Sequence, residues 1–488
     1  MGSTFDSSAP FGHNWTRTKT LDIQVPPEQL DKLLDYVTSI LEKNKYLSNL
    51  SRSTTAGVGT LQYRLTGNDG SVLDIAIKIQ PDKVEVYYAP YPPQSVGEKD
   101  YVGLDLEIET VVRSYFSDQS KASLFLVFSP KMEIIPNKKE NPIKKALGSV
   151  VLGNFLWFFV LILFIGVILI SFIGIYTPLV LIAIQAVIVL FAGRLVRLRG
   201  EFDITPDNPS IFIAELRMKR DEFDQVIKTC LPKIKEVKKK IYDATLGQGR
   251  DLDPGTVVTT LNDYGAVCMP EFVKIKSVNV YKLITDLGQR FGIVKPSVTL
   301  LNVLAPNAAA TGVSPKRATV LVTSGLVASM NESEIRTVLA HEFSHVRARD
   351  PLVLLTLATA MYLFWVYVLV PIVPASLFFV TIILIFVFYT LLFFVAKFLE
   401  ARADLDAAVT TGEPKVLADS LRKLGLYKYR SHVFELINAG EWVSWDTHPP
   451  LYYRIRTLEN YNPSGEHHTQ IEAIRGCLRG FADALKGK

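Results

Sequence analysis

The 488-residue chain has only three cysteines, Cys230, Cys268 and Cys477, and they stand far apart. Because no C-x-x-C pair occurs among them, neither a disulfide framework nor a thiolate metal site is indicated. The first residues, MGSTFDSSAP, lack a basic segment followed by an apolar one, so we predict no cleavable signal peptide. No G-x-x-x-x-G-K-[ST] phosphate loop is present, which argues against ATP-driven work by this chain. The net charge of +5 is small, and no basic arm interleaved with aromatic residues points to nucleic acid.

Charged residues and histidine are missing from two long stretches, residues 146–193 and 351–396. Each stretch is long enough for two spans of about 20 residues, the length needed to cross about 30 Å of hydrocarbon. Each is broken near its middle, at 174–178 and at 371–374. Buried core helices are the alternative, but uncharged stretches of this length are rare in soluble domains. The sequence therefore predicts a multi-pass α-helical membrane protein with two transmembrane hairpins and four transmembrane helices.

Basic residues flank both hairpins, whereas the two hairpin turns are uncharged. The flanking residues are Lys138, Lys139, Lys144, Lys145, Arg194, Arg197, Arg199, Arg347, Arg349 and Lys397. An even number of spans leaves the N-terminal region, the middle and the C-terminus on one side, and the positive-inside rule makes that side cytoplasmic. We therefore expect a protein of the plasma or inner membrane whose soluble parts all face the cytoplasm.

The first 145 residues are predicted to form a separate soluble α+β domain. Alternating and helical apolar patterns indicate strands at 20–25, 61–65, 72–88 and 123–127, and helices at 27–45 and 104–116. No catalytic motif occurs in this region. The charged, helix-prone residues 208–243 are predicted to form part of a cytoplasmic arm.

The segment NESEIRTVLAHEFSH, residues 331–345, carries the first sign of chemistry. Asn331 and Glu334 have capping-box spacing, and the apolar residues that follow have helical spacing. His341 and His345 therefore lie on one face of a helix, where both imidazoles can reach one Zn²⁺ at about 2.0–2.1 Å. Glu342 can then accept a proton from the attacking water as the catalytic base. A chance H-E-x-x-H is the alternative, so a third ligand is needed.

The third ligand is predicted just after the second hairpin, in the segment KFLEARADLDAA, residues 397–408. Glu400 and Asp404 are four residues apart on a predicted helix, so both lie on one face. Glu400 can complete a His₂Glu zinc site, and Asp404 can hold a ligand imidazole by its other N–H. An acidic residue this close to a span end is commonly only a solvated helix terminus. The register with the H-E-x-x-H helix across an antiparallel hairpin favours ligation.

Taken in order, these motifs resemble the HtpX branch of the membrane-embedded gluzincin peptidases, over about residues 280–458. The matching segments are NAAATG at 307–312, with Ala309 in place of the family's aromatic residue; TSGL at 323–326; HEFSH at 341–345 with Asp350; EARAD at 400–404; and HPPLYYRI at 448–455. Two uncharged hairpins in the expected places complete the resemblance.

The resemblance implies an ATP-independent zinc endopeptidase with one Zn²⁺ per chain and a zincin-like α+β protease domain. Its substrates would be misfolded or damaged membrane proteins, cleaved in protein quality control and the stress response. The backbone of Asn307, Ala308, Ala309 and Ala310 would form an edge strand that receives substrate by β-augmentation. His448 and Arg454 would be catalytic candidates that stabilise the oxyanion or order the site.

Together the hairpins and motifs divide the chain into six parts. These are an N-terminal domain (1–145), transmembrane hairpin 1 (146–197), a charged helical cytoplasmic arm (198–265), the first part of the protease domain (266–350), transmembrane hairpin 2 (351–396) and the second part of the protease domain (397–488). Bacterial members of the family begin almost directly with the first span, so the resemblance does not extend to the N-terminal domain.

Two other functions are compatible with parts of the pattern. A CAAX prenyl protease shares the H-E-x-x-H, E-x-x-x-D and H-P-P elements, but those enzymes have more spans around a large chamber. A non-catalytic membrane sensor or scaffold would act through the N-terminal domain, with a vestigial zinc site. Intact ligands and an intact base argue against the second function.

Overall fold

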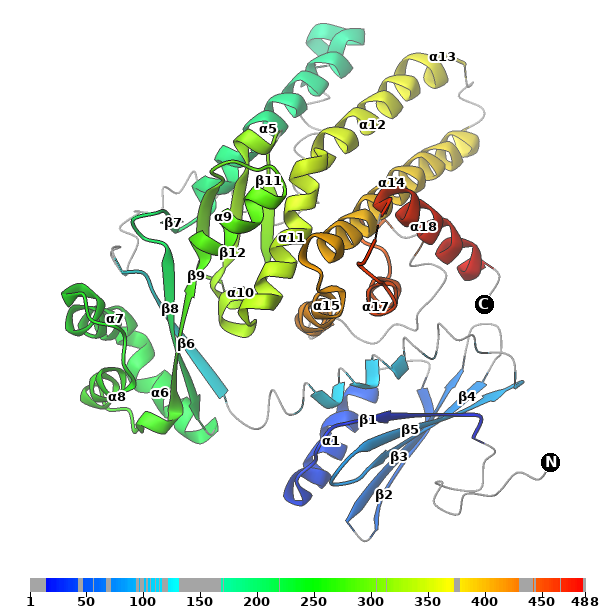
Figure 1. The fold of residues 1–488 in the computed structure, drawn as a ribbon. Helices are drawn as coiled ribbons and strands as arrows, with labels where there is room; N and C mark the ends of the chain where they lie inside the picture. The colour runs from blue at the N-terminus through cyan, green and yellow to red at the C-terminus, as the bar shows by residue number, and fades with distance from the viewer. Residues whose placement is uncertain are drawn as a thin grey trace.

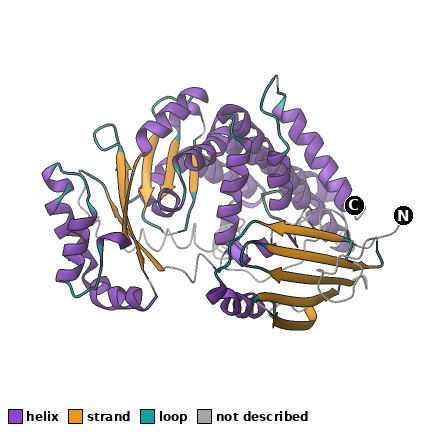
Figure 2. Ribbon diagram, turned by 60° about the horizontal axis from the view of Figure 1, so that its bottom comes forward, coloured by secondary structure: helices purple, strands orange, loops and turns teal. Residues whose placement is uncertain are grey.

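A computed structural model of the chain describes residues 15–42, 47–55, 57–66, 72–93, 122–130, 168–372, 378–429, 442 and 445–485, apart from residues 170, 219, 304, 313 and 466, together with residue 96 and part of 101–115. Figures 1 and 2 show three separate β-sheets and a set of long helices. The long helices project from the part that holds the predicted protease domain, residues 266–350 and 397–485, which is called the catalytic part.

The N-terminal domain is built on a five-stranded antiparallel sheet in the order β1-β5-β4-β3-β2. The strands are β1 (Arg17–Leu21), β2 (Leu47–Thr55), β3 (Val58–Thr66), β4 (Val72–Ile79) and β5 (Val84–Tyr91), and α1 (Leu30–Leu41) packs on the sheet. Alternate residues of β3 are buried, which is the pattern of a strand with one face on a core. The sequence prediction of a strand at 72–88 merged β4 and β5, which form a hairpin.

A second, three-stranded sheet has the order β6-β8-β9 and is antiparallel. It consists of β6 (Ala122–Phe128), β8 (Ser210–Met218) and β9 (Val273–Asn279), with α6 (Arg220–Cys230), α7 (Ile234–Ala244) and α8 (Pro254–Asp263) beside it. In β8, Ile211 and Ile213 join the core of the catalytic part, whereas Leu216 and Met218 join the core made with α6, α7 and α8.

This second sheet corrects two details of the predicted layout. Strand β6 pairs with β8 and not with the N-terminal sheet, although the sequence placed 123–127 in the domain that ends at 145. The region 198–265 is not a helical arm, because it contains β8 as well as β7 (Phe202–Ile204). Burial alternates along β8, but the buried face changes between Ile213 and Ala214, so the two halves of the strand face different cores.

The catalytic part contains a four-stranded sheet in the order β11-β12-β10-β7. Strands β10 (Ser297–Leu301) and β12 (Thr319–Thr323) are parallel, and β11 (Ala308–Thr311) is an antiparallel edge strand. Around it lie α9 (Val280–Arg290), α10 (Ser324–Ser329) and α11 (Glu332–Ala348), which share one apolar core with the sheet. The sheet with its helices is an α+β arrangement, but β7 comes from the segment 198–265, which the sequence assigns to the arm and not to the protease domain.

Three described helices are long and apolar enough to cross a membrane: Ser171–Arg194, Asp350–Leu369 and Ile382–Thr411. The first contains most of α5 (Thr177–Arg199), the second is α12 (Asp350–Phe364) with a π-helical turn at Trp365–Leu369, and the third lies in α14 (Phe378–Thr411). The first span of the predicted hairpin 1 falls mainly on 146–167, outside the described residues.

Helix α14 runs without a break from the apolar span into the catalytic part, where it lies against α11. The chain continues through α15 (Pro414–Tyr429), α17 (Leu451–Glu459) and α18 (Thr469–Leu485). Helix α18 packs along α14 through contacts such as the edge-to-face pair of Phe394 and Phe481. The apolar span and the helix that carries the predicted ligand Glu400 are therefore one continuous element.

The predicted capping box at the start of α11 is confirmed. The Asn331 side chain accepts a hydrogen bond from the Glu334 backbone N–H at 2.9 Å, and the Glu334 carboxylate accepts one from the Asn331 backbone N–H at 2.9 Å. These bonds satisfy backbone donors that a helix N-terminus leaves free.

We expect Asn331→Ala to destabilise the protein by about 1 kcal/mol, because the cap is lost. Asn331→Ser is the matched control, since serine can accept the same backbone hydrogen bond. Thermal unfolding of the detergent-purified chain measures the difference. Equal melting temperatures for the alanine variant and the wild type would show that the cap contributes nothing.

Candidate metal centre

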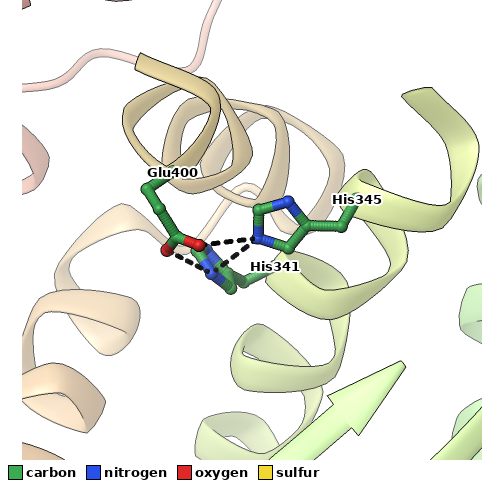
Figure 3. A group of neighbouring side chains, drawn as sticks. All are labelled: His341, His345 and Glu400. Carbon is green, nitrogen blue, oxygen red and sulfur yellow. Dashed lines mark hydrogen bonds and ion pairs between the residues drawn. The ribbon is translucent and has the colours of Figure 1, made fainter. Parts of the chain in front are cut away.

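Two helices bring three potential metal ligands together (Figure 3). His341 and His345 extend from one face of α11, and Glu400 extends from α14. The Nε2 atoms of the two histidines are 3.3 Å apart. Glu400 Oε2 lies 3.4 Å from Nε2 of His341, and Glu400 Oε1 lies 3.4 Å from Nε2 of His345. The three side chains therefore converge on one point. The H-E-x-x-H motif supplies two of them, and the predicted motif on α14 supplies the third.

These separations fit a tetrahedral metal ion. Two ligand atoms that each lie about 2.0–2.1 Å from one tetrahedral centre are about 3.3–3.4 Å from each other. Glu400 Oε2 is also buried and accepts no hydrogen bond within the described part of the chain. A buried carboxylate oxygen without a donor is costly unless a cation compensates it. The donor set of two imidazoles and one carboxylate suits Zn²⁺.

His341 is held from behind by a carboxylate. Asp404 Oδ1 lies 2.9 Å from Nδ1 of His341. The guanidinium of Arg454 bonds the same carboxylate with two hydrogen bonds, from Nε to Oδ2 and from Nη2 to Oδ1, both at 2.7 Å. Such a bidentate pair fixes the orientation of the carboxylate and hence of the imidazole that it contacts.

His345 has an equivalent support, which sequence reasoning missed. Asp350 Oδ2 lies 2.7 Å from Nδ1 of His345. The same oxygen accepts a hydrogen bond from Nη2 of Arg402 at 2.6 Å, and Asp350 Oδ1 accepts one from Nη1 at 3.0 Å. From the sequence, Asp350 is predicted only as part of a motif, and Arg402 has no predicted role. Their pairing joins residues 52 positions apart, so no local pattern could reveal it.

Backbone geometry at Arg349 places Asp350 beside His345. Arg349 has φ +60° and ψ +38°, the left-handed conformation that ends α11, and α12 begins at the next residue. A residue other than glycine rarely adopts this conformation. The turn changes the direction of the chain within one residue, so that the Asp350 side chain is directed back to the histidine of the preceding turn.

The carboxylates make the site favourable for positive charge. Burial alone would lower the pKa of His341, but Asp404 and Glu400 outweigh burial and raise the pKa to about 10. The pocket therefore stabilises a positive charge between the two carboxylates, either as a proton on the imidazole or as a cation. A bound cation would replace this proton, since a ligating imidazole must be neutral.

Glu342 faces the edge strand β11. Its Oε2 accepts a hydrogen bond from the backbone N–H of Ala310 at 3.1 Å. The Ala310 peptide N–H thus points away from β12 and towards α11. Because backbone groups alternate in direction along an antiparallel strand, the polar groups of Ala308 also face this open edge, whereas those of Ala309 face β12.

Asn307 differs from its neighbours. Its backbone N–H donates to Oγ1 of Thr323 at 2.8 Å, and its carbonyl accepts a hydrogen bond from the Thr323 backbone N–H at 3.0 Å. Both backbone polar groups of Asn307 are therefore engaged by Thr323. Of the four predicted substrate-binding residues, only Ala308 and Ala310 direct their peptide groups to the open edge.

His448 and Arg454 both lie at the cluster, in different surroundings. His448 is about half exposed, and its Nε2 is 3.5 Å from Glu400 Oε2. Arg454 is buried, and its Nη2 is 3.9 Å from the same oxygen. Since Arg454 is bound to Asp404 by two hydrogen bonds, it has less freedom than His448 to contact a substrate.

Comparison with known proteins agrees with the geometry of this site. The model of peptidase family M48 matches residues 276–462. The chain is 31% identical to a protease HtpX homologue of Desulfatibacillum aliphaticivorans, with 43% of this chain and 79% of that protein covered. It is 33% identical to one of Pyrococcus furiosus, covering 37% and 72%, and 34% identical to protease HtpX homolog 2 of Methanosarcina mazei, covering 37% and 71%.

We expect Asp350→Asn to weaken metal binding by about 10- to 100-fold, because an outer partner that orients and polarises a ligand histidine loses its charge. Competition against a chromogenic zinc chelator at fixed pH measures this affinity. Asp419→Asn is the matched control, since Asp419 is an exposed residue of α15 that pairs with Arg422. An unchanged affinity in Asp350→Asn would mean that Asp350 does not support His345.

Proposed function

The chain belongs to peptidase family M48 and is an HtpX-type metallopeptidase of the membrane, and from this premise we propose how its residues cleave peptide bonds. His341, His345 and Glu400 hold one Zn²⁺, and Glu342 is the catalytic base. The observation that carries the proposal is the convergence of three ligand atoms with separations of 3.3–3.4 Å. The CAAX prenyl protease and the non-catalytic scaffold are not favoured by any contact in the described residues.

When bound, the metal ion polarises the scissile carbonyl and lowers the pKa of water at the site. Glu342 follows His341 directly on α11, and its carboxylate accepts the hydrogen bond of the Ala310 N–H. In this scheme the carboxylate serves the space beside the three ligands. There it takes a proton from the attacking water and later delivers it to the leaving amine. No covalent bond to the enzyme forms in this scheme.

The open edge of β11 orients the substrate. An extended peptide that pairs with this edge bonds to the outward-facing N–H and carbonyl of Ala308 and to the carbonyl of Ala310. The Ala310 N–H is hydrogen-bonded to Glu342, so the proposed catalytic base lies directly beside this edge. This arrangement would place the scissile bond between β11 and the metal ligands.

His448 and Arg454 have different roles in this proposal. His448 lies at the exposed side of the cluster, where its ring can contact the oxygen that becomes negatively charged in the transition state. Arg454 is a positioning residue, because it holds Asp404 behind His341. Loss of His448 should therefore affect the rate constant of cleavage, whereas loss of Arg454 should also affect metal binding.

The substrates are proteins, and we propose that they are misfolded or damaged membrane proteins cleaved in quality control without ATP. The ligand Glu400 lies only three residues beyond Lys397, the first charged residue after the apolar part of α14. At about 1.5 Å per residue, this places the site within about 5 Å of the end of the apolar segment. A chain that emerges from the bilayer would meet the site almost at once.

We expect Glu342→Gln to keep about one zinc ion per chain and to lose about 10²- to 10⁴-fold in the rate of casein cleavage, because general base catalysis is removed. Glu332→Gln, in the first turn of the same helix, is the matched control and should cleave like the wild type. Metal analysis and cleavage assays on detergent-purified protein measure both properties. Cleavage by a zinc-loaded Glu342→Gln variant at the wild-type rate would exclude Glu342 as the base.

The N-terminal domain, the catalytic part and the C-terminus are proposed to be cytoplasmic. Green fluorescent protein fused to the C-terminus should therefore fluoresce. Alkaline phosphatase fused at the same point should be inactive, because it requires an oxidising compartment to form its disulfides. An active phosphatase fusion would reverse the orientation. Fusions after residue 373, in the second hairpin turn, provide the control and should give the opposite pattern.

A further inference from the structure

Trp445, three residues before His448 in the sequence, packs against the apolar part of α14. Its ring centroid is 5.8 Å from that of Phe386, 5.4 Å from that of Tyr389 and 6.4 Å from that of Phe393. The planes of Trp445 and Phe393 are nearly parallel, at 9°. Residues 386, 389 and 393 have helical spacing, so the three rings line one face of α14. One tryptophan from the catalytic part therefore packs across about two turns of a membrane helix.

The position of these rings along α14 places Trp445 at the level of the bilayer. Lys397 is the first charged residue of α14, and Phe393, Tyr389 and Phe386 precede it by 4, 8 and 11 residues. At about 1.5 Å per residue, they lie about 6, 12 and 16 Å into the apolar segment. A bilayer core is about 30 Å thick. Trp445 therefore reaches from the interface towards the acyl chains.

Within the described part of the chain, no other segment covers the outer side of this aromatic cluster. Trp445 and Phe386 are each 51% exposed, and Tyr389 is 44% exposed. The cluster is continuous with the apolar surface of the span Ile382–Thr411. Since tryptophan and tyrosine are enriched where a membrane protein meets the interface, the occupant of this surface is lipid.

The segment 445–448 connects the aromatic cluster to the metal ligands. The Asp446 carbonyl accepts a hydrogen bond from Nζ of Lys397 at 2.5 Å, and Lys397 is fully buried on α14. The Asp446 carboxylate accepts one from the His448 backbone N–H at 2.9 Å and lies 3.1 Å from Nδ1 of the His448 ring. His448 in turn lies 3.5 Å from Glu400. The segment is thus attached to α14 on the membrane side and reaches the site within three residues.

We propose that Trp445 is a lipid-embedded positioning residue that anchors the segment 445–448 to α14 and so holds His448 over the metal ligands. The bilayer covers the outer face of Trp445, and Phe386, Tyr389 and Phe393 support its inner face. Anchoring in lipid is independent of the proposed catalytic function, whereas the effect on cleavage rests on the proposed role of His448.

Anchoring is tested by fluorescence in nanodiscs made of phosphatidylcholine with or without bromine on the acyl chains, which quenches tryptophan on contact. The contribution of Trp445 is the emission that is lost in Trp445→Phe. We expect brominated lipid to quench this contribution by more than half. Trp15→Phe, in the N-terminal domain, is the matched control, and the emission lost there should not be quenched. An unquenched Trp445 contribution would overturn the proposal.

Positioning is tested in the same nanodiscs by peptide cleavage. We expect Trp445→Ala to lower kcat by about tenfold with little change in KM, since a small displacement of a catalytic group affects the transition state. Trp445→Phe should recover most of the rate, because an aromatic ring still stacks on Phe393. Zinc content should equal that of the wild type in both variants.

The outcomes separate this proposal from the proposed function. If His448→Ala cleaves normally, the role of His448 fails even when Trp445 is quenched by lipid. If His448→Ala is impaired but Trp445→Ala cleaves at the wild-type rate, His448 acts without the anchor and the present proposal is wrong. A quenched Trp445, an impaired Trp445→Ala and a rescued Trp445→Phe together support it.

Discussion

The close approach of α11 and α14 at His341, His345 and Glu400 is the contact on which the catalytic part depends. Three ligand atoms from the two helices lie within 4.8 Å of one another. Two of them come from one helical face and need only the local geometry of α11. The third must be delivered by α14, which returns after an apolar hairpin of about 46 residues. Because α14 is one continuous helix, any tilt of its membrane part would be transmitted to Glu400.

Burying charge at this contact requires compensation. Asp350, Asp404, Arg402 and Arg454 are all nearly inaccessible to solvent. An isolated buried carboxylate or guanidinium is strongly unfavourable, but each here is paired with a partner of opposite charge in good geometry. His341 and His345 thus each have their own carboxylate, and each carboxylate has its own arginine. A buried polar network with its members paired stiffens a site, which is what a constellation of metal ligands needs.

The membrane and the site are mechanically connected through the same helix. Towards one end α14 carries Glu400, and its apolar part carries the aromatic face against which Trp445 packs. Lys397 lies between them and bonds the segment that leads to His448. For the membrane-protein substrates proposed above, the bilayer that holds the substrate would also hold the elements of the proposed site.

Much of this protein could be predicted from its sequence, because the decisive patterns are local. A helical turn brings His341 and His345 to one face whatever surrounds them, and long uncharged stretches have few alternatives to a membrane. The capping box at Asn331 depends only on residues within four positions. Glu400 required one longer step, the assumption that a hairpin returns the chain to where it left.

Tertiary structure alone decided what depends on residues far apart in the chain. Strands β6 and β8 pair although about 80 residues separate them in the sequence, so linear order placed β6 in the wrong domain. The pairing of Asp350 with Arg402, and the bonds that occupy Asn307 but leave Ala308 and Ala310 at an open edge, likewise have no local signature. Nor does the packing of Trp445 on α14. Helix periodicity and apolar length are properties of neighbouring residues, whereas these contacts depend on how completed elements pack, and local sequence patterns do not encode that packing.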